Sequence, residues 1–287
     1  MIVINVLINS LFLMYFLLKN KGSSVFNRHS ILRFLILVAF GIGAFLVTAY
    51  FESLFTTLMS VCFAGSLNYV NGVLVWYSKF LEISYYFIYF FFVANIVEEL
   101  AKILPAYFYS ENFLFGKTSF KKFDFIIPFL IVGLTISVIE NGMFFYKTSN
   151  NLVYLRILTQ FSSHILWALL IGEAYFRYSV KANANKIYNI FRSKDVPDIK
   201  AISGMKPKKM FKLSCVIIMF IHGLFEFLVY NFPIIGLVFI GVCLVCCIIF
   251  IIKIKNSHFK ETSIKRFLKD NNQLTYDEVK LFLELTL

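Results

Sequence analysis

Seven apolar stretches, each long enough to cross a lipid bilayer as a helix, take up most of this 287-residue sequence. A helix needs about 20 mainly apolar residues to span the ~30 Å hydrocarbon core. The stretches cover residues 2–18, 31–51, 84–109, 124–146, 152–177, 211–230 and 234–252. Only 15% of the residues are charged, whereas soluble domains have about a quarter. The sequence therefore predicts an all-α fold, a polytopic transmembrane helical bundle of about seven spans.

The segment 53–66 is apolar but too short to span by itself, and Gly65, Ser66 and Asn68 interrupt it. It either extends the second helix or lies along the membrane interface. The first stretch has no basic residues before it and no small-residue cleavage site, so we expect a retained span and not a signal peptide.

Lysine and arginine follow a pattern along the chain. Every second connection is basic, namely 19–33, 117–122, the loop 178–210 and the start of the tail at Lys253. Because cytoplasmic loops of membrane proteins carry excess positive charge, we predict a multi-pass plasma-membrane protein with its N-terminus outside and its C-terminus in the cytoplasm. The same pattern accounts for the net charge of +12, so no nucleic-acid partner is expected.

The predicted organisation is one transmembrane domain over residues 1–257 and a cytoplasmic tail over 258–287. The domain contains a motif-bearing core, residues 84–230, and the cytoplasmic loop 178–210. In the tail, Thr275 followed by Glu278 is typical of a helix start, so we expect a short C-terminal helix.

Ionisable side chains recur inside four of the predicted spans. Such a residue costs at least ~2.5 kcal/mol at mid-bilayer and by default marks a functional site. The residues are Glu98, Glu99 and Lys102; Glu140 and Asn141; His164; and His222 with Glu226. Carboxylates and imidazoles at similar depth are the groups that move protons and activate water.

The third span carries its polar residues on one face. At 100° per residue, Asn95, Glu98, Glu99 and Lys102 fall on one narrow stripe, with the lysine between the two carboxylates. Such a lysine can hold one glutamate ionised for work as a base. The simpler alternative is a buried ion pair that fixes helix packing. Pro105 follows one turn later and predicts a kink beside the stripe.

The other clusters are weaker when each is taken alone. Glu140 and Asn141 would face a neighbouring helix, and a lone His164 is more often a packed core residue than a catalyst. His222 and Glu226 share a helix face, so the glutamate could orient the imidazole. This pair lacks the second histidine and the central glutamate of the HExxH zinc motif.

Taken in order, the clusters resemble the motifs of the PrsW family of intramembrane proteases, and more broadly the superfamily of CAAX prenyl proteases and abortive-infection proteins. The motifs read Glu98-Glu99-x-x-Lys102; Glu140-Asn141 with Tyr146; Arg156-x7-His164-x7-Gly172; and His222-x3-Glu226. Two positions depart from the family pattern. Phe144 stands where the second motif usually has tyrosine, and Glu226 stands where the last motif usually has Asp or Asn.

The resemblance implies an endopeptidase that cuts membrane-embedded or membrane-proximal proteins or peptides within the lipid bilayer. As a mechanism we expect Glu98 or Glu99, with His164, to activate a water molecule. His222, positioned by Glu226, would then stabilise the oxyanion or protonate the leaving amine. Lys102 would tune the carboxylate pair, and Glu140 and Asn141 would bind substrate or support the site.

Metal dependence stays open at this stage. His164, His222 and Glu99 could hold Zn²⁺ with water in the fourth position, but a metal-free carboxylate–imidazole site would use the same residues. Two other functions also remain. A proton-coupled transporter would string polar residues across the full membrane depth, and a non-catalytic scaffold or sensor would bind a partner without cutting it.

Overall fold

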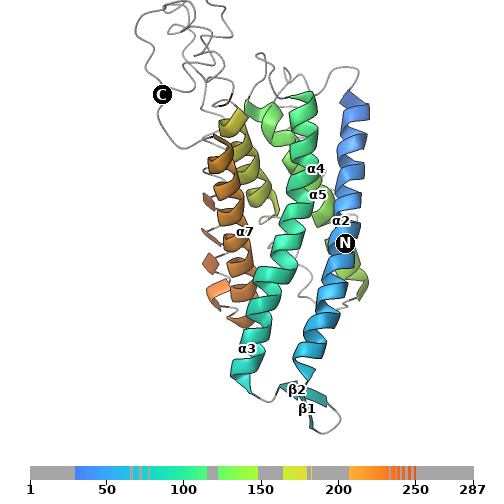
Figure 1. Cartoon of the computed structure of the whole chain (residues 1–287), viewed down its shortest axis with the longest axis vertical. Helices are drawn as coiled ribbons and strands as arrows, with labels where there is room; N and C mark the ends of the chain where they lie inside the picture. Colours follow the sequence, from blue (N-terminus) through green and yellow to red (C-terminus); the bar gives the residue numbers. More distant parts are fainter. Residues whose placement is uncertain are drawn as a thin grey trace, which may run out of the picture.

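The computed structural model describes residues 30–64, 67–70, 73–76, 78–114, 122–147, 164–179, 182 and 207–232, and parts of 234–249. Long helices lie side by side along most of the molecule, and a small hairpin caps one end (Figure 1). In chain order the labelled helices are α2 (Ser30–Cys62), α3 (Lys79–Ile88), η3 (Tyr89–Ala94), α4 (Asn95–Phe113), α5 (Lys122–Lys147) and α7 (Pro207–Asn231). A further helix covers residues 164–179 and is drawn in yellow in Figure 1.

Within the part of the chain that the structure describes, four helical segments are long and apolar enough to cross a membrane. They are Leu32–Cys62, Lys79–Phe113, Asp124–Met143 and Lys208–Asn231. These segments match the predicted spans 31–51, 84–109, 124–146 and 211–230. The protein is therefore a multi-pass helical membrane protein.

The remaining predicted spans are described in part or not at all. The predicted span 152–177 is described from residue 164 and is helical from there to residue 179. The span 234–252 is helical at the positions described between 234 and 249. The span 2–18, most of the loop 178–210 and the tail 258–287 lie outside the described residues.

Most of the segment 53–66 extends the second helix, which was one of the two predicted alternatives. α2 runs without a break from Ser30 to Cys62, so most of that apolar segment is part of the span. Glu52, which the shorter prediction placed just beyond the helix end, lies well inside α2.

A β-hairpin joins α2 to α3, which the all-α prediction missed. Strands β1 (Leu67–Val70) and β2 (Val73–Trp76) pair antiparallel, with Leu67 opposite Trp76. The sequence did carry the signal, because Asn71-Gly72 between two apolar runs is typical of a tight hairpin turn.

A π-helical turn, η3, interrupts the long helix that α3 and α4 form together. At its end the backbone N–H of Asn95 donates to the carbonyl oxygen of Phe90, five residues earlier. Such turns change the direction in which the following side chains point and are frequent at functional sites. Here the turn lies immediately before the Glu98 stripe. Pro105 lies inside α4, which continues as an α-helix to Phe113.

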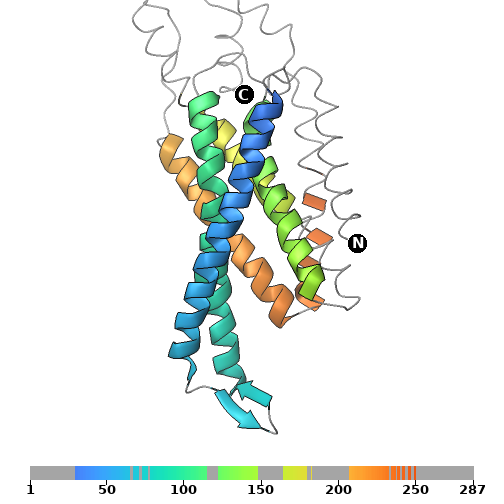
Figure 2. The same cartoon turned by 90° about the vertical axis from the view of Figure 1, so that its right-hand side faces the viewer.

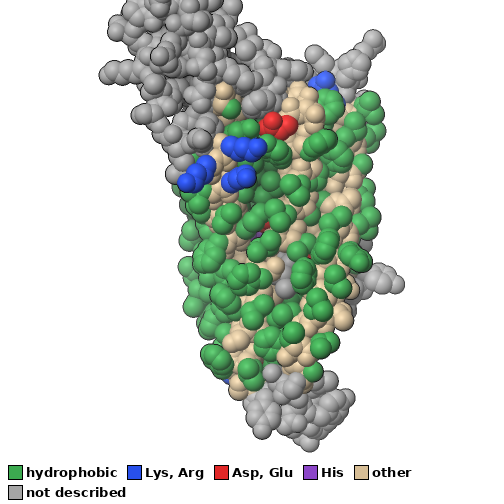
Figure 3. Space-filling model, viewed as in Figure 1, with side chains coloured by type: hydrophobic (Ala, Val, Ile, Leu, Met, Phe, Trp, Pro, Cys, Tyr) green, Lys and Arg blue, Asp and Glu red, His purple; other side chains and the backbone are tan. Residues whose placement is uncertain are grey.

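The core is centred on α5, whose side chains are the most deeply buried among the candidate spans. Both α2 and α4 pack against α5, and α7 packs against η3 and α4. Figure 2 shows α2 in front of the long α3–η3–α4 helix and α7 inclined across it. On the surface in Figure 3, apolar side chains cover the middle of the face, whereas Lys and Arg gather towards one end.

Small residues let the helices approach closely. A Cβ atom on Gly172 would lie 2.8 Å from the Cα of Ile126 on α5, so only glycine fits without a backbone shift. Gly133 of α5 faces Ala168 in the same interface. Close contact through small residues is a common way to pack helices in membranes, and here it fixes the helix that carries His164.

We predict that Gly172→Ala loosens this interface. The added methyl group would push against backbone, so the free energy of unfolding should fall by about 1–3 kcal/mol. Thermal unfolding in detergent measures the effect. The matched control is Gly43→Ala on α2, where a Cβ atom meets nothing within 4 Å. Equal melting temperatures for the two variants would contradict the packing described here.

Candidate active site

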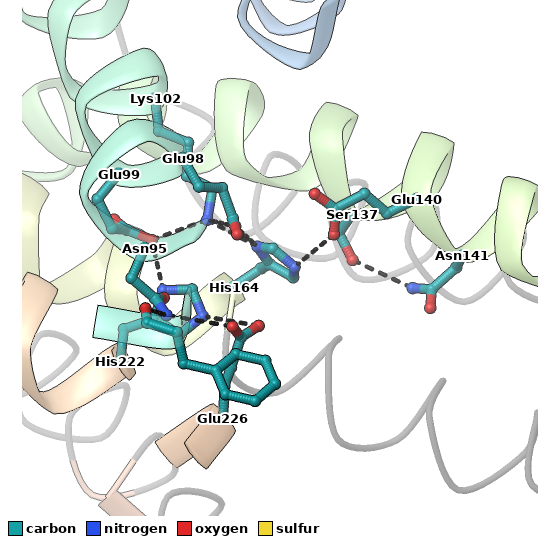
Figure 4. A network of polar contacts seen from close by, with 11 residues as sticks. Asn95, Glu98, Glu99, Lys102, Ser137, Glu140, Asn141, His164, His222 and Glu226 are labelled. Carbon is teal, nitrogen blue, oxygen red and sulfur yellow. Dashed lines mark hydrogen bonds and ion pairs between the residues drawn. The ribbon is translucent and has the colours of Figure 1, made fainter. Parts of the chain in front are cut away.

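The polar residues predicted from the four motifs lie together in one network between the helices (Figure 4). α4 contributes the stripe of Asn95, Glu98, Glu99 and Lys102, and α7 contributes His222 and Glu226. α5 contributes Glu140 and Asn141, and His164 stands at the start of the described part of its helix. Segments far apart in the sequence thus meet at one place.

The stripe on α4 is the buried side of that helix, as the 100° periodicity predicted. Asn95, Glu98, Glu99 and Lys102 are all buried, and Glu99 is fully inaccessible. On the opposite side of α4, Leu104 is 59% exposed and Phe108 is 66% exposed. The charged residues therefore point into the protein and the apolar residues point towards the surrounding lipid.

Lys102 is at the centre of the network. Its ammonium group donates to Glu98 Oε1, to Glu99 Oε1 at 2.8 Å and to His164 Nδ1 at 3.0 Å. A lysine has three N–H donors and no acceptor, so these contacts use its full capacity. This cation is committed to the site and has no donor left for a substrate.

The lysine also determines the protonation pattern of His164. Because Lys102 can only donate, Nδ1 of His164 must accept, and the ring hydrogen of the neutral imidazole is on Nε2. Nε2 lies 3.3 Å from Glu140 Oε2, which can accept that hydrogen. His164 thus links the Lys102 cluster to the carboxylate on α5.

His222 has the reverse arrangement. Its Nδ1 lies 2.8 Å from Glu99 Oε1, and a carboxylate that is ion-paired with lysine can only accept. Nδ1 of His222 therefore carries a hydrogen, and Nε2, which keeps its lone pair when the ring is neutral, lies 3.7 Å from Glu226 Oε1. A carboxylate that holds a histidine in this way is the usual support of a metal ligand.

Two amides complete the network in different ways. Asn95 donates to Glu226 Oε2 at 3.1 Å and so ties α4 to α7. Asn141 donates to Ser137 one turn earlier on its own helix, at 3.3 Å. The sequence had placed Asn95 only on the stripe, whereas the structure puts it in direct contact with Glu226.

Two groups of three side chains have ligand atoms close enough to hold one metal ion. Glu98, Glu140 and His164 form one group, and Glu98, His222 and Glu226 form the other, each with ligand atoms within 4.8 Å of one another. Glu98 belongs to both groups. The set suggested by sequence, His164, His222 and Glu99, is not among the groups that the described residues form, because Glu99 instead contacts Lys102 and His222 Nδ1.

The donor pattern favours the group around His222 as the metal-binding group. Each Nε2 lies near a carboxylate, but the lone pairs of the neutral rings differ in position: that of His164 is on Nδ1 and accepts from Lys102, whereas that of His222 is on Nε2, on the side of Glu226. Two carboxylates, one imidazole and a water molecule would complete the four positions typical of catalytic zinc.

Glu52 on α2 is a residue of this region that the sequence analysis missed. It is partly buried and interacts electrostatically with Glu98, Glu140 and Glu226. The missed signal was an acidic residue within an apolar run that continues to residue 62. Of the motif residues, Arg156 lies outside the described residues, and the side chains of Phe144 and Tyr146 are not described.

The comparison with protein families agrees with this geometry. The model of the PrsW family of intramembrane metalloproteases matches residues 33–254, which include every residue of the network. Searches of curated proteins and of solved structures returned no match. The match covers most of the chain and all four polar motifs, so this chain belongs to the PrsW family of intramembrane metalloproteases.

Proposed function

We propose that this protein is a metal-dependent intramembrane endopeptidase that hydrolyses peptide bonds of membrane-embedded or membrane-proximal proteins. The observation that carries the proposal is the position of His222, which is held at Nδ1 by Glu99 and directs Nε2 towards Glu226 within a ligand group that includes Glu98. Buried among four helices, this arrangement has a donor set suited to a catalytic metal.

Zn²⁺ fits this donor set, and Glu98, His222 and Glu226 would hold it. When bound, the ion would supply a Lewis acid and lower the pKa of a coordinated water molecule. Glu99 keeps the imidazole in the tautomer that a ligand needs. Asn95 fixes the Glu226 carboxylate through its hydrogen bond to Oε2.

Glu140 is the carboxylate that we assign as general base. A base should not itself be a metal ligand, and Glu140 lies outside the group around His222. Its side chain is 17% exposed, so it can meet a substrate, whereas Glu99 is fully buried. Glu140 would take a proton from the attacking water and return it to the leaving amine, and His164 would hold it in place from Nε2.

The substrate must present an extended segment to this site. In a transmembrane helix the carbonyl groups are bonded within the helix, and irregular backbone is tolerated at membrane depth only where protein or water surrounds it. A cut within the bilayer therefore requires local unwinding of the substrate next to the polar network.

We also propose how the chain is oriented in the membrane. Seven spans with the N-terminus outside and the C-terminus in the cytoplasm of a plasma-membrane protein would account for the basic connections. The division into a transmembrane domain, residues 1–257, and a cytoplasmic tail, 258–287, follows from that topology.

We predict that Glu140→Gln abolishes proteolysis without loss of the fold. Removal of a general base should lower kcat by about 10²–10⁴-fold, as measured on a single-pass reporter protein in vesicles. Glu82→Gln is the matched control, because Glu82 pairs with Lys79 outside the network. Cleavage by Glu140→Gln at the rate of the control would exclude Glu140 as the base.

We further predict that substitution of His222 removes the bound metal, whereas substitution of His164 removes cleavage and leaves the metal in place. Purified wild-type protein should contain about one zinc ion per chain by elemental analysis. His222→Ala should lose it, and Glu99→Gln should weaken zinc binding about 10–100-fold because the imidazole loses its support. His164→Ala should keep the metal and lose cleavage. If His164→Ala loses the metal and His222→Ala retains it, the metal belongs instead to the group of Glu98, Glu140 and His164.

A further inference from the structure

The first two turns of α7 carry three lysines on the outside of the molecule. Lys208, Lys209 and Lys212 are exposed and form the lysine cluster of α7, whereas Phe211 between them is only 7% exposed. Phe211 stacks on Tyr178, with ring centroids 5.7 Å apart. Because this ring faces inwards, the lysines lie on the outer side of the helix. Lys and Arg side chains gather at the end of the molecule where α7 begins (Figures 1 and 3).

The lysine cluster has no acidic partner among the residues that the structure describes. No ion pair joins it to another described side chain. The first turn of α7 contains no acidic residue, although the helix dipole favours anions at that end. Two acids of neighbouring helices are engaged elsewhere, because Glu173 pairs with Arg177 at 2.9 Å and Glu111 accepts a hydrogen bond from Tyr175 at 3.1 Å. The lysines and the helix start therefore both favour an anion from outside the protein.

The side of α7 that carries the lysine cluster continues along the helix as an exposed apolar face. Lys212, Val216 and Phe220 follow each other at intervals of four residues and so share one side of the helix. Lys209 and Leu213 have the same spacing. Val216 is 60% exposed, Phe220 58% and Leu213 48%, within a helix that is long and apolar enough to cross the membrane. These apolar side chains therefore face the acyl chains of the bilayer, and the lysines lie at the border of that surface.

An anionic phospholipid matches this succession of positive charge and apolar surface. From Lys212 to Phe220 the helix rises about 12 Å, which lies within one leaflet of the ~30 Å hydrocarbon core. A phospholipid places its phosphate directly above its acyl chains, and lysines at a membrane surface attract anionic headgroups. A soluble anion would meet the lysines but would gain nothing from the apolar row below them. The combined surface therefore favours a lipid over a soluble ligand.

We propose that the lysine cluster of α7 binds the headgroup of an anionic phospholipid, whose acyl chains lie along Val216 and Phe220. The surface is on the outside of the bundle, so the proposal does not depend on the proteolytic function. The bound lipid would hold α7 at a defined depth in the membrane. That depth matters for the candidate active site, because the same helix carries His222 and Glu226.

The test places a fluorescent reporter beside this surface. Val216→Trp adds a tryptophan to the whole chain in phosphatidylcholine vesicles, where brominated lipids quench tryptophan on contact. The emission of Trp76 and Trp167 is subtracted with the protein that lacks the reporter. Brominated phosphatidylglycerol should bind beside the reporter about tenfold more tightly than brominated phosphatidylcholine, because each nearby lysine favours an anionic lipid about fivefold and salt screens part of the effect. A reporter on α2, Leu46→Trp, should show no such preference, since Leu46 is 61% exposed on another helix.

Removal of the lysines should remove the preference. With the same reporter, the triple variant Lys208→Gln, Lys209→Gln, Lys212→Gln should bind both lipids about equally, and Lys212→Gln alone should reduce the preference about threefold. Lys79→Gln is the matched control, because that lysine is also exposed but pairs with Glu82 outside α7, and it should leave the preference unchanged. The substituted lysines are exposed, so the melting temperature of the triple variant should stay close to that of the wild type.

Equal binding of the two lipids beside the intact lysine cluster would overturn the proposal. A preference that survives the triple substitution, or that the reporter on α2 shows to the same extent, would overturn it as well. Addition of inorganic phosphate at constant ionic strength separates a lipid from a soluble anion. If phosphate abolishes the preference, the lysines take an anion from solution and the proposed lipid is wrong. A preference that withstands phosphate and disappears in the triple variant supports the lipid surface.

Discussion

The buried ammonium group of Lys102 is the interaction on which the rest of the site depends. It touches two carboxylates on its own helix and an imidazole on another, and one of those carboxylates in turn holds His222 on α7. In a low-dielectric interior, removing one partner of such a set leaves an uncompensated charge. The relative positions of three helices are therefore coupled to one cation.

Glycine residues at two helix contacts let the backbones come close enough for this arrangement. Gly172 lets the His164 helix lie directly against α5, and Gly223, next to His222, lets α7 approach Phe91 in η3. The π-helical turn of η3 then sets the direction of the α4 stripe. Helix packing by small residues and one irregular turn thus decides how close the acids and imidazoles come.

Two histidines of the same type acquire opposite roles from their neighbours. A lysine can only donate, so His164 keeps its hydrogen on Nε2; a paired carboxylate can only accept, so His222 keeps its hydrogen on Nδ1. In the neutral rings, the lone pair of His164 accepts from Lys102, whereas the lone pair of His222 is on Nε2, on the side of Glu226. This asymmetry gives the two imidazoles different surroundings within one network, and the proposed division into a metal-ligand group and a separate carboxylate–imidazole pair rests on it.

The sequence by itself determined the helices, the stripe on α4, the His222–Glu226 pair and the membership in the family, because each depends on hydrophobicity or on spacing within one helix. Only the tertiary structure decided that Glu98 and not Glu99 belongs to the ligand groups, that Asn95 reaches Glu226 and that Glu52 faces the site. These contacts join residues of different helices. They depend on the rotation and depth of each helix, which close packing between helices determines and local periodicity does not encode.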